Sequence, residues 1–142
     1  RRVILCTGKV YYDLLASLEE RAADQVALVR VEQLYPFPEA ELRAALERYA
    51  EAEEILWVQE EAENMGAWYF LRPLLTDVLP AGRILRYVGR DEAASPAVGD
   101  AVSHQNEQQE IVDVALDMGS RNELKLEAVQ SRVASGDGGS GN

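Results

Sequence analysis

Residues able to do chemistry are concentrated in one stretch of this sequence, QEEAENMGAWYFL, which runs from Gln59 to Leu71. It holds three carboxylates, an asparagine, a glycine and three large aromatic residues. The neighbouring carboxylates Glu60 and Glu61 would point to opposite sides of an extended chain, which makes them a poor acid–base pair. The stretch is therefore either a binding face or the joint between a strand and a helix.

A binding face is suggested by position, because the stretch begins at the end of the strand expected at residues 53–59. Open α/β sheets bind ligands at the carboxyl ends of their strands. The aromatic run 68–70 covers so much of a helix circumference that part of it must face something besides its own sheet. Aromatic residues are enriched at protein interfaces. The alternative is a strand end, a helix cap and core aromatics. The candidate interface or ligand residues are Gln59, Glu60, Glu61, Asn64, Gly66, Trp68 and His104.

The single histidine, His104, and the single cysteine, Cys6, limit the chemistry further. They exclude a disulfide within the chain, a cysteine-based zinc site and a multi-histidine metal centre. A small hydrolase would have to use His104 with Ser95 or Ser103, whereas a lone histidine is more often a cap or a surface group. Cys6 lies in an apolar run and is expected to be a small buried residue.

Apolar strand patterns alternate with amphipathic helix patterns along most of the chain, which predicts an α/β domain. The expected architecture has three layers, with a mainly parallel sheet of four to five strands and helices on both faces. One edge strand could be antiparallel. Pro73 is expected to kink or split its helix. The expected strands are 3–8, 25–34, 53–59 and 83–89, and the expected helices are 9–23, 38–50, 65–79 and 103–118.

The composition changes after residue 119. Residues 1–119 form the predicted α/β domain, and residues 120–142 end in serine, glycine, aspartate and asparagine. Such a composition is typical of a flexible tail. Leu124, Leu126, Val129 and Val133 give this tail the material for one short amphipathic helix.

The formal net charge is −11, from 14 lysines and arginines against 25 aspartates and glutamates. The acidic excess lies wholly in residues 1–119, because residues 120–142 hold three of each sign. An acidic surface repels phosphate backbones, so a nucleic-acid partner is not expected. No apolar run is long enough to cross a bilayer, and no leader opens the chain, so neither a membrane partner nor secretion is expected. The chain does not start with methionine, which suggests a fragment of something longer.

Five motifs, taken together and in order, resemble the C-terminal domain of the decarboxylating component of the 2-oxoglutarate dehydrogenase complex. They are RVILCTGKVYYDLL, VALVRVEQLYPFP, WVQEEAENMGAWYFL, LRYVGRDEAASPAVG and HQNEQQEIV. The resemblance runs from about Arg2 to Leu116, and the last domains of transketolase-like enzymes are its broader relatives. It implies a supporting and dimer-forming domain of an enzyme that oxidatively decarboxylates 2-oxoglutarate and transfers a succinyl group to lipoyl.

The resemblance also implies that thiamine diphosphate and magnesium belong to the full-length enzyme and that neither is bound by this chain. The implied partners are the earlier domains, a second copy in a homodimer and a lipoyl succinyltransferase. The implied location is the bacterial cytoplasm, with the mitochondrial matrix as the alternative. Some members bind acetyl-CoA near this domain, but no residue here can be assigned to that role.

One tripeptide of this sequence matches the start of a coenzyme-binding signature, but the residues around it do not fit that signature. Gly136-Asp137-Gly138 has the first part of the thiamine diphosphate signature, but it has no preceding apolar strand and only four residues follow it. It is therefore interpreted as a chance match. The first strand–helix joint has a single glycine, Gly8, and no phosphate loop. A freestanding regulatory or interaction domain, which binds a nucleotide-like ligand or a partner protein through Gln59–Trp68, is the alternative function.

Overall fold

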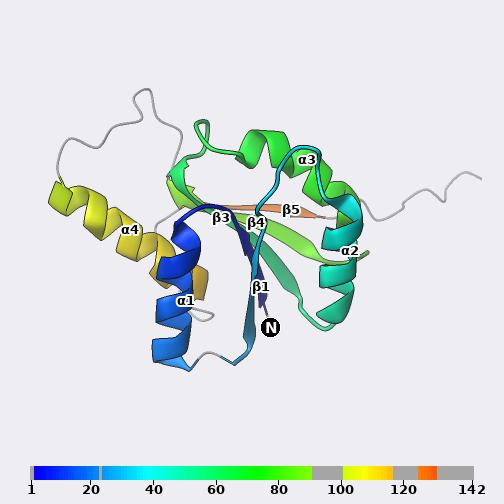
Figure 1. Ribbon diagram of the computed structural model, residues 1–142, viewed down its shortest axis with the longest axis horizontal. Helices are drawn as coiled ribbons and strands as arrows, with labels where there is room; N and C mark the ends of the chain where they lie inside the picture. The colour runs from blue at the N-terminus through cyan, green and yellow to red at the C-terminus, as the bar shows by residue number, and fades with distance from the viewer. Residues whose placement is uncertain (1, 23, 91–100, 117–124, 131–142) are drawn as a thin grey trace, which may run out of the picture.

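The computed structural model describes residues 2–22, 24–90, 101–116 and 125–130, with side chains described over 2–22, 24–90 and 107–116. A five-stranded sheet lies at its centre, in the order β2-β1-β3-β4-β5 (Figure 1). The first four strands are parallel, and β5 is antiparallel to β4. The strands are β1 (Arg2–Cys6), β2 (Val26–Arg30), β3 (Glu54–Ala62), β4 (Ile84–Arg90) and β5 (Lys125–Gln130).

Helices cover both faces of the sheet and give the three layers that the sequence predicted (Figure 1). The pair α1 (Val10–Arg21) and α4 (Ala101–Leu116) packs on one face. The pair α2 (Glu39–Arg48) and α3 (Trp68–Val78) packs on the other. This α/β architecture confirms the predicted fold class.

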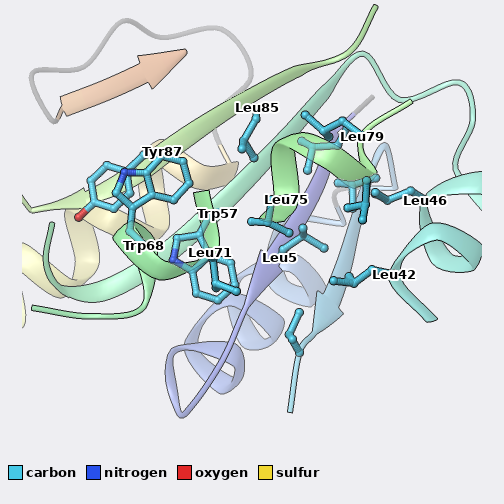
Figure 2. Packing of buried hydrophobic residues seen from close by; sticks show 14 of the residues in the cluster. Leu5, Leu42, Leu46, Trp57, Trp68, Leu71, Leu75, Leu79, Leu85 and Tyr87 are labelled. Atoms are coloured by element: carbon cyan, nitrogen blue, oxygen red, sulfur yellow. The ribbon is translucent and has the colours of Figure 1, made fainter. Parts of the chain in front are cut away.

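Two apolar clusters hold the layers together because successive residues of each strand point to opposite faces of the sheet. In β1, Val3 and Leu5 join the cluster under α2 and α3, whereas Ile4 and Cys6 join the cluster under α1 and α4. Figure 2 shows the first cluster, which contains Trp57 from β3 and leucines of both helices. Trp57 is fully buried in this cluster.

The expected tail does not agree with the structure over residues 125–130. A tail with at most one short helix was predicted there, whereas these residues form β5 in the same sheet. The segment KLEAVQ alternates polar and apolar residues at its start, which suits a strand as well as a helix. Pairing with β4 decides between them, because it satisfies backbone groups that would otherwise lie along an open sheet edge. The Gly136-Asp137-Gly138 match lies outside the described residues.

One helix and one strand also differ from expectation in detail. Helix α3 continues through Pro73 from Trp68 to Val78, so proline does not split it. Strand β3 runs on to Ala62, past the predicted end at residue 59, because Ala62 still pairs with Arg90 of β4. Glu60 and Glu61 therefore belong to the strand, and the turn to α3 begins only after them.

Candidate functional site

The carboxyl ends of the parallel strands form the edge at which an α/β sheet of this kind binds ligands. The strand order changes direction at β1: β2 is added on one side of it, whereas β3 and β4 are added on the other. Polar residues from α1, β3, β4 and α4 meet at this edge. We call them the carboxyl-edge cluster: Asp13, Glu60, Arg90, Glu107 and Gln108.

Hydrogen bonds connect the members of the carboxyl-edge cluster across four elements. The Gln108 side-chain amide donates to Asp13 Oδ2 over 2.9 Å and to Glu60 Oε2 over 3.3 Å. Arg90 donates from Nε to the Glu60 backbone oxygen over 2.9 Å and from a terminal nitrogen to Glu107 Oε2 over 3.2 Å. One amide and one guanidinium thus tie α4 to α1, β3 and β4.

Gln59 lies just inside this edge and is almost fully buried, with 2% of its surface exposed. Its Oε1 accepts hydrogen bonds from the indole of Trp57 at 2.9 Å and from the backbone N–H of Trp68 at 3.1 Å. Its Nε2 donates to the backbone oxygen of Ala62 at 2.9 Å and to that of Glu61 at 3.3 Å. Gln59 therefore joins the end of β3 to the first residue of α3.

Gly66 is required by this joint. A Cβ on residue 66 would lie 2.8 Å from three atoms of the Gln59 amide group, which is too close for any real side chain. Two of the predicted site residues thus have a structural role, which is the alternative that the sequence left open for this stretch. Their predicted part in ligand or partner binding stays a prediction.

The other predicted residues lie in different environments. Glu60 is half-buried in the carboxyl-edge cluster, and Glu61 and Asn64 are exposed. Trp68 is fully buried and packs against Tyr87 with the two rings tilted and their centroids 5.3 Å apart, so it does not lie on an exposed face of this chain. The exposed aromatic residues of α3 are Tyr69 and Phe70, each 48% exposed. These two carry the exposed aromatic surface that the sequence pattern indicated.

His104 belongs to α4, but its side chain lies outside the described residues, as does that of Ser103. Ser95 is also outside them. The hydrolase alternative therefore stays a prediction. Sequence reasoning missed Asp13, Arg90, Glu107 and Gln108, and the signal available for Arg90 was its place directly after the apolar run of β4.

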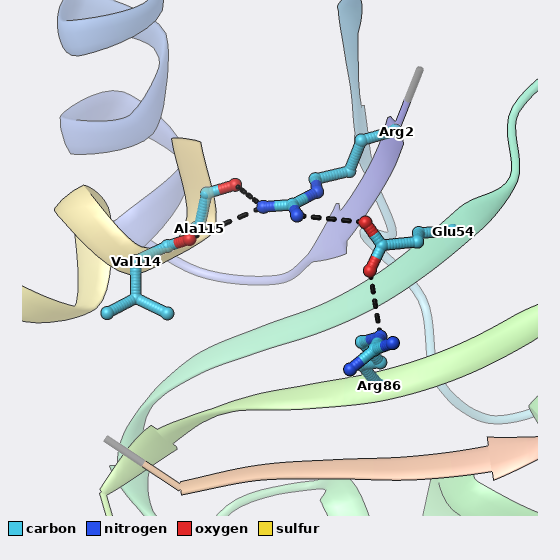
Figure 3. Close-up of polar contacts among 5 residues, drawn as sticks. All are labelled: Arg2, Glu54, Arg86, Val114 and Ala115. Carbon is cyan, nitrogen blue, oxygen red and sulfur yellow. Dashed lines mark hydrogen bonds and ion pairs between the residues drawn. The ribbon is translucent and has the colours of Figure 1, made fainter. Parts of the chain in front are cut away.

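A second polar cluster lies at the opposite, amino ends of the strands (Figure 3). Arg2 donates from Nη1 to the backbone oxygens of Ala115 at 2.8 Å and Val114 at 3.3 Å, both in the last turn of α4. It also donates from Nη2 to Glu54 Oε1 at 2.9 Å, and Glu54 Oε2 pairs with Arg86 Nε at 2.7 Å. A cation at a helix carboxyl end is favoured by the helix dipole, so Arg2 fixes α4 to β1 and β3.

A cavity of about 720 Å³ opens near these amino ends. Its walls come from the first residues of β1, from residues 24–27 at the start of β2 and from residues 48–52 after α2. Its lining mixes apolar side chains such as Val26 and Ala52 with the charged Asp24, Arg48 and Glu51.

Burial raises the pKa of the Cys6 thiol to about 12, with Arg30 opposing the rise. A thiol of this kind is inert at neutral pH, because only the thiolate is nucleophilic. Within the part of the chain that the structure describes, no three histidine, cysteine, aspartate or glutamate residues are grouped to hold a metal ion. No helix among those residues is long and apolar enough to span a membrane.

The parallel sheet with an antiparallel edge strand and the two helix layers define an α/β domain, and comparison with known proteins gives its family. Residues 1–116 match the model of the family described as 2-oxoglutarate dehydrogenase C-terminal. The chain belongs to this family, as its motifs suggested.

Several bacterial relatives, each called 2-oxoglutarate dehydrogenase E1 component, are similar to the chain. The protein of Cupriavidus necator is 44% identical over 115 residues, which cover 81% of this chain and 12% of the relative. That of Coxiella burnetii is 45% identical over 119 residues, which cover 82% of this chain and 13% of the relative. That of a Geobacillus species is 46% identical over 116 residues, which cover 81% of this chain and 12% of the relative. The chain thus spans about an eighth of the length of the relatives that it matches.

Proposed function

We propose that this chain is the supporting C-terminal domain of a 2-oxoglutarate dehydrogenase E1 component. The main support for this proposal is the family match over residues 1–116. The relatives are about eight times as long as the part that matches this chain. The whole enzyme would oxidatively decarboxylate 2-oxoglutarate and pass the succinyl group to the lipoyl arm of a succinyltransferase partner. The earlier domains of the same enzyme and a second copy would be its other partners. Because the relatives are bacterial, we place it in the bacterial cytoplasm.

In this proposal, thiamine diphosphate and magnesium are bound by other parts of the enzyme, because the described residues do not fit the coenzyme. The edge where a ligand would sit is occupied by the Asp13–Gln108–Glu60 bridge, whose carboxylates would repel a diphosphate. The β1–α1 joint has one glycine, Gly8, and no glycine-rich cradle for phosphate. No catalytic step is therefore assigned to residues of this chain.

The exposed aromatic surface of α3 supports a role in packing against another domain or subunit. Tyr69 and Phe70 are each 48% exposed, and Met65, which precedes α3 in the chain, is 42% exposed. Large apolar groups at such exposure are typical of surfaces that another domain or subunit covers. We assign this surface to the earlier domains of the enzyme. A freestanding interaction domain would use the same surface for a different protein.

Titration calorimetry tests the proposed function directly. The 142-residue chain, mixed with thiamine diphosphate and magnesium, should give no binding heat, and it should release no carbon dioxide from 2-oxoglutarate. A full-length E1 component from one of the bacterial relatives is the positive control for both measurements. Micromolar coenzyme binding by the short chain would overturn the supporting role.

A further inference from the structure

Strand β2 ends the sheet with an open edge. Among the described residues, β1 is the only strand that pairs with it. The Val31 N–H donates to the Cys6 oxygen, and the Gln25 oxygen accepts from the Arg2 N–H. Odd-numbered residues of β2 therefore turn their backbone groups towards β1, and the even-numbered Val26, Leu28 and Arg30 turn theirs outward.

This edge lacks most of the features that protect an edge strand from pairing. It has no proline, lysine, bulge or inward-pointing carboxylate in the sequence VALVR. Ala27, Leu28 and Val29 pack partly on the two apolar clusters but stay half-exposed. Although the chain as a whole is strongly acidic, β2 itself carries no negative charge that would repel another copy of itself.

We propose that β2 pairs antiparallel with β2 of a second copy about a two-fold axis at Ala27, which joins two five-stranded sheets into one. The inference adds the contact strand and its register to the homodimer of the proposed function, and it rests on that part of it. A two-fold pairing must be self-complementary, so each feature of the edge has to meet its own copy or a matching feature.

The charged residues near the ends of β2 favour one register of the antiparallel pairing. Only pairings that place even-numbered residues opposite even-numbered ones bring the outward backbone groups together. With Ala27 on the axis, Val26 faces the partner's Leu28, and the exposed Asp24 faces the partner's Arg30, twice by symmetry. A shift that puts Leu28 on the axis would instead set Asp24 opposite the partner's Glu32, a repulsive pair. The first register is therefore favoured.

The cavity and an exposed tyrosine support the same arrangement. Tyr35 follows β2 and is 84% exposed, and the cavity of about 720 Å³ opens beside residues 24–27 at the start of β2. Antiparallel pairing brings the carboxyl end of one β2, with Tyr35 beyond it, to the amino end of the other. Each copy thus offers an aromatic side chain at the end of the sheet where its partner has an opening.

Cysteine cross-linking of the 142-residue chain tests the register. In Ala27→Cys the two new thiols would face each other in a non-hydrogen-bonded pair, at a separation of about 4.5 Å between Cα atoms, which a disulfide can bridge. Mild oxidation should therefore give a covalent dimer on a non-reducing gel. The matched control, Leu28→Cys, should not link, because residue 28 then faces residue 26. Linking by Leu28→Cys in place of Ala27→Cys would overturn the proposed register.

Sedimentation over a concentration series gives the second measurement, with circular dichroism melting to confirm that each variant folds. The unmodified chain should self-associate. Asp24→Arg and Tyr35→Ser should each weaken the association about tenfold. Phe70→Ser, which removes an exposed aromatic residue from the α3 surface, should leave the association unchanged.

The outcomes separate this inference from the homodimer of the proposed function. A chain that self-associates without an Ala27→Cys link overturns the β2 contact and leaves the homodimer standing. A chain that stays monomeric while a full-length relative sediments as a dimer also overturns the β2 contact, because other domains then supply the interface. If the full-length relative is monomeric too, the homodimer of the proposed function fails as well.

Discussion

The side-chain amide of Gln59 occupies the space into which a Cβ on residue 66 would project. Gln59 can make its four hydrogen bonds at the β3–α3 joint only because the chain can pass close to it at Gly66. The two residues thus form one unit, although seven positions separate them in the sequence.

Replacing Gly66 by alanine should therefore destabilise the domain by about 1–3 kcal/mol, since the new methyl group must displace the Gln59 amide. Chemical denaturation measures the loss. In a Gln59→Ala background the same substitution should cost clearly less, because the clash is gone. Gly82→Ala is the matched control: its backbone has a φ of +82° but open space around it, so its cost should be independent of Gln59.

Replacing Gln59 by glutamate tests the hydrogen bonds without changing the shape. One carboxylate oxygen would still accept from Trp57 and Trp68, but the other would face the carbonyl oxygens of Ala62 and Glu61. We expect a loss of about 2–4 kcal/mol at neutral pH, partly restored in acid as the carboxyl becomes protonated. The exposed Gln33→Glu variant should change stability by less than about 0.5 kcal/mol. Equal losses in both variants would contradict the proposed joint.

Arg2 should stabilise the domain through its bonds to Ala115, Val114 and Glu54. Arg2→Met should cost about 2–3 kcal/mol, because these bonds are charge-assisted and the side chain is only 10% exposed. Hydrogen exchange should show the largest loss of protection in the last turn of α4. The control is Arg43→Met, which breaks an exposed pair with Glu39 and an exposed hydrogen bond to the Asp77 backbone oxygen, and it should cost less than about 1 kcal/mol. A loss of protection spread evenly over the domain would argue against a local clamp.

Cys6 should make the domain sensitive to alkaline pH. Its pKa is raised from 9.0 to about 12 in the folded chain, so the unfolded chain loses this proton first as pH rises. Stability that is fully present below pH 9 should therefore decline between pH 9 and about 12. The comparison of wild type with Cys6→Ala isolates this contribution from other alkaline titrations. Parallel stability curves for the two proteins above pH 9 would refute it.

Local patterns were sufficient to predict the layers of the fold. The uniformly apolar runs gave the four parallel strands, and helical spacing gave the four helices between and after them. The buried position of Cys6 followed from the first of these runs. These features depend on residues close together in the sequence, which is why one sequence reveals them.

Features set by distant partners could not be predicted. The bond from Gln108 to Asp13 joins residues far apart in the chain, and nothing near Asp13 signals it. Trp68 looked like part of an exposed aromatic run, but the contact with Tyr87 of β4 turns it into the core. In the same way, β5 exists as a strand because β4 has an edge to pair with, and its own short sequence suits a helix equally well.

The place of β1 in the sheet has a mechanical consequence. It lies between β2 and β3 and is held by ladders of backbone bonds on both sides. A pull applied at Arg2 along the strand axis would load both ladders in shear, so that β1 could not peel away one bond at a time. The same pull would reach α4 through the Arg2 guanidinium. The domain should therefore move as one rigid body with any segment that is tethered to β1.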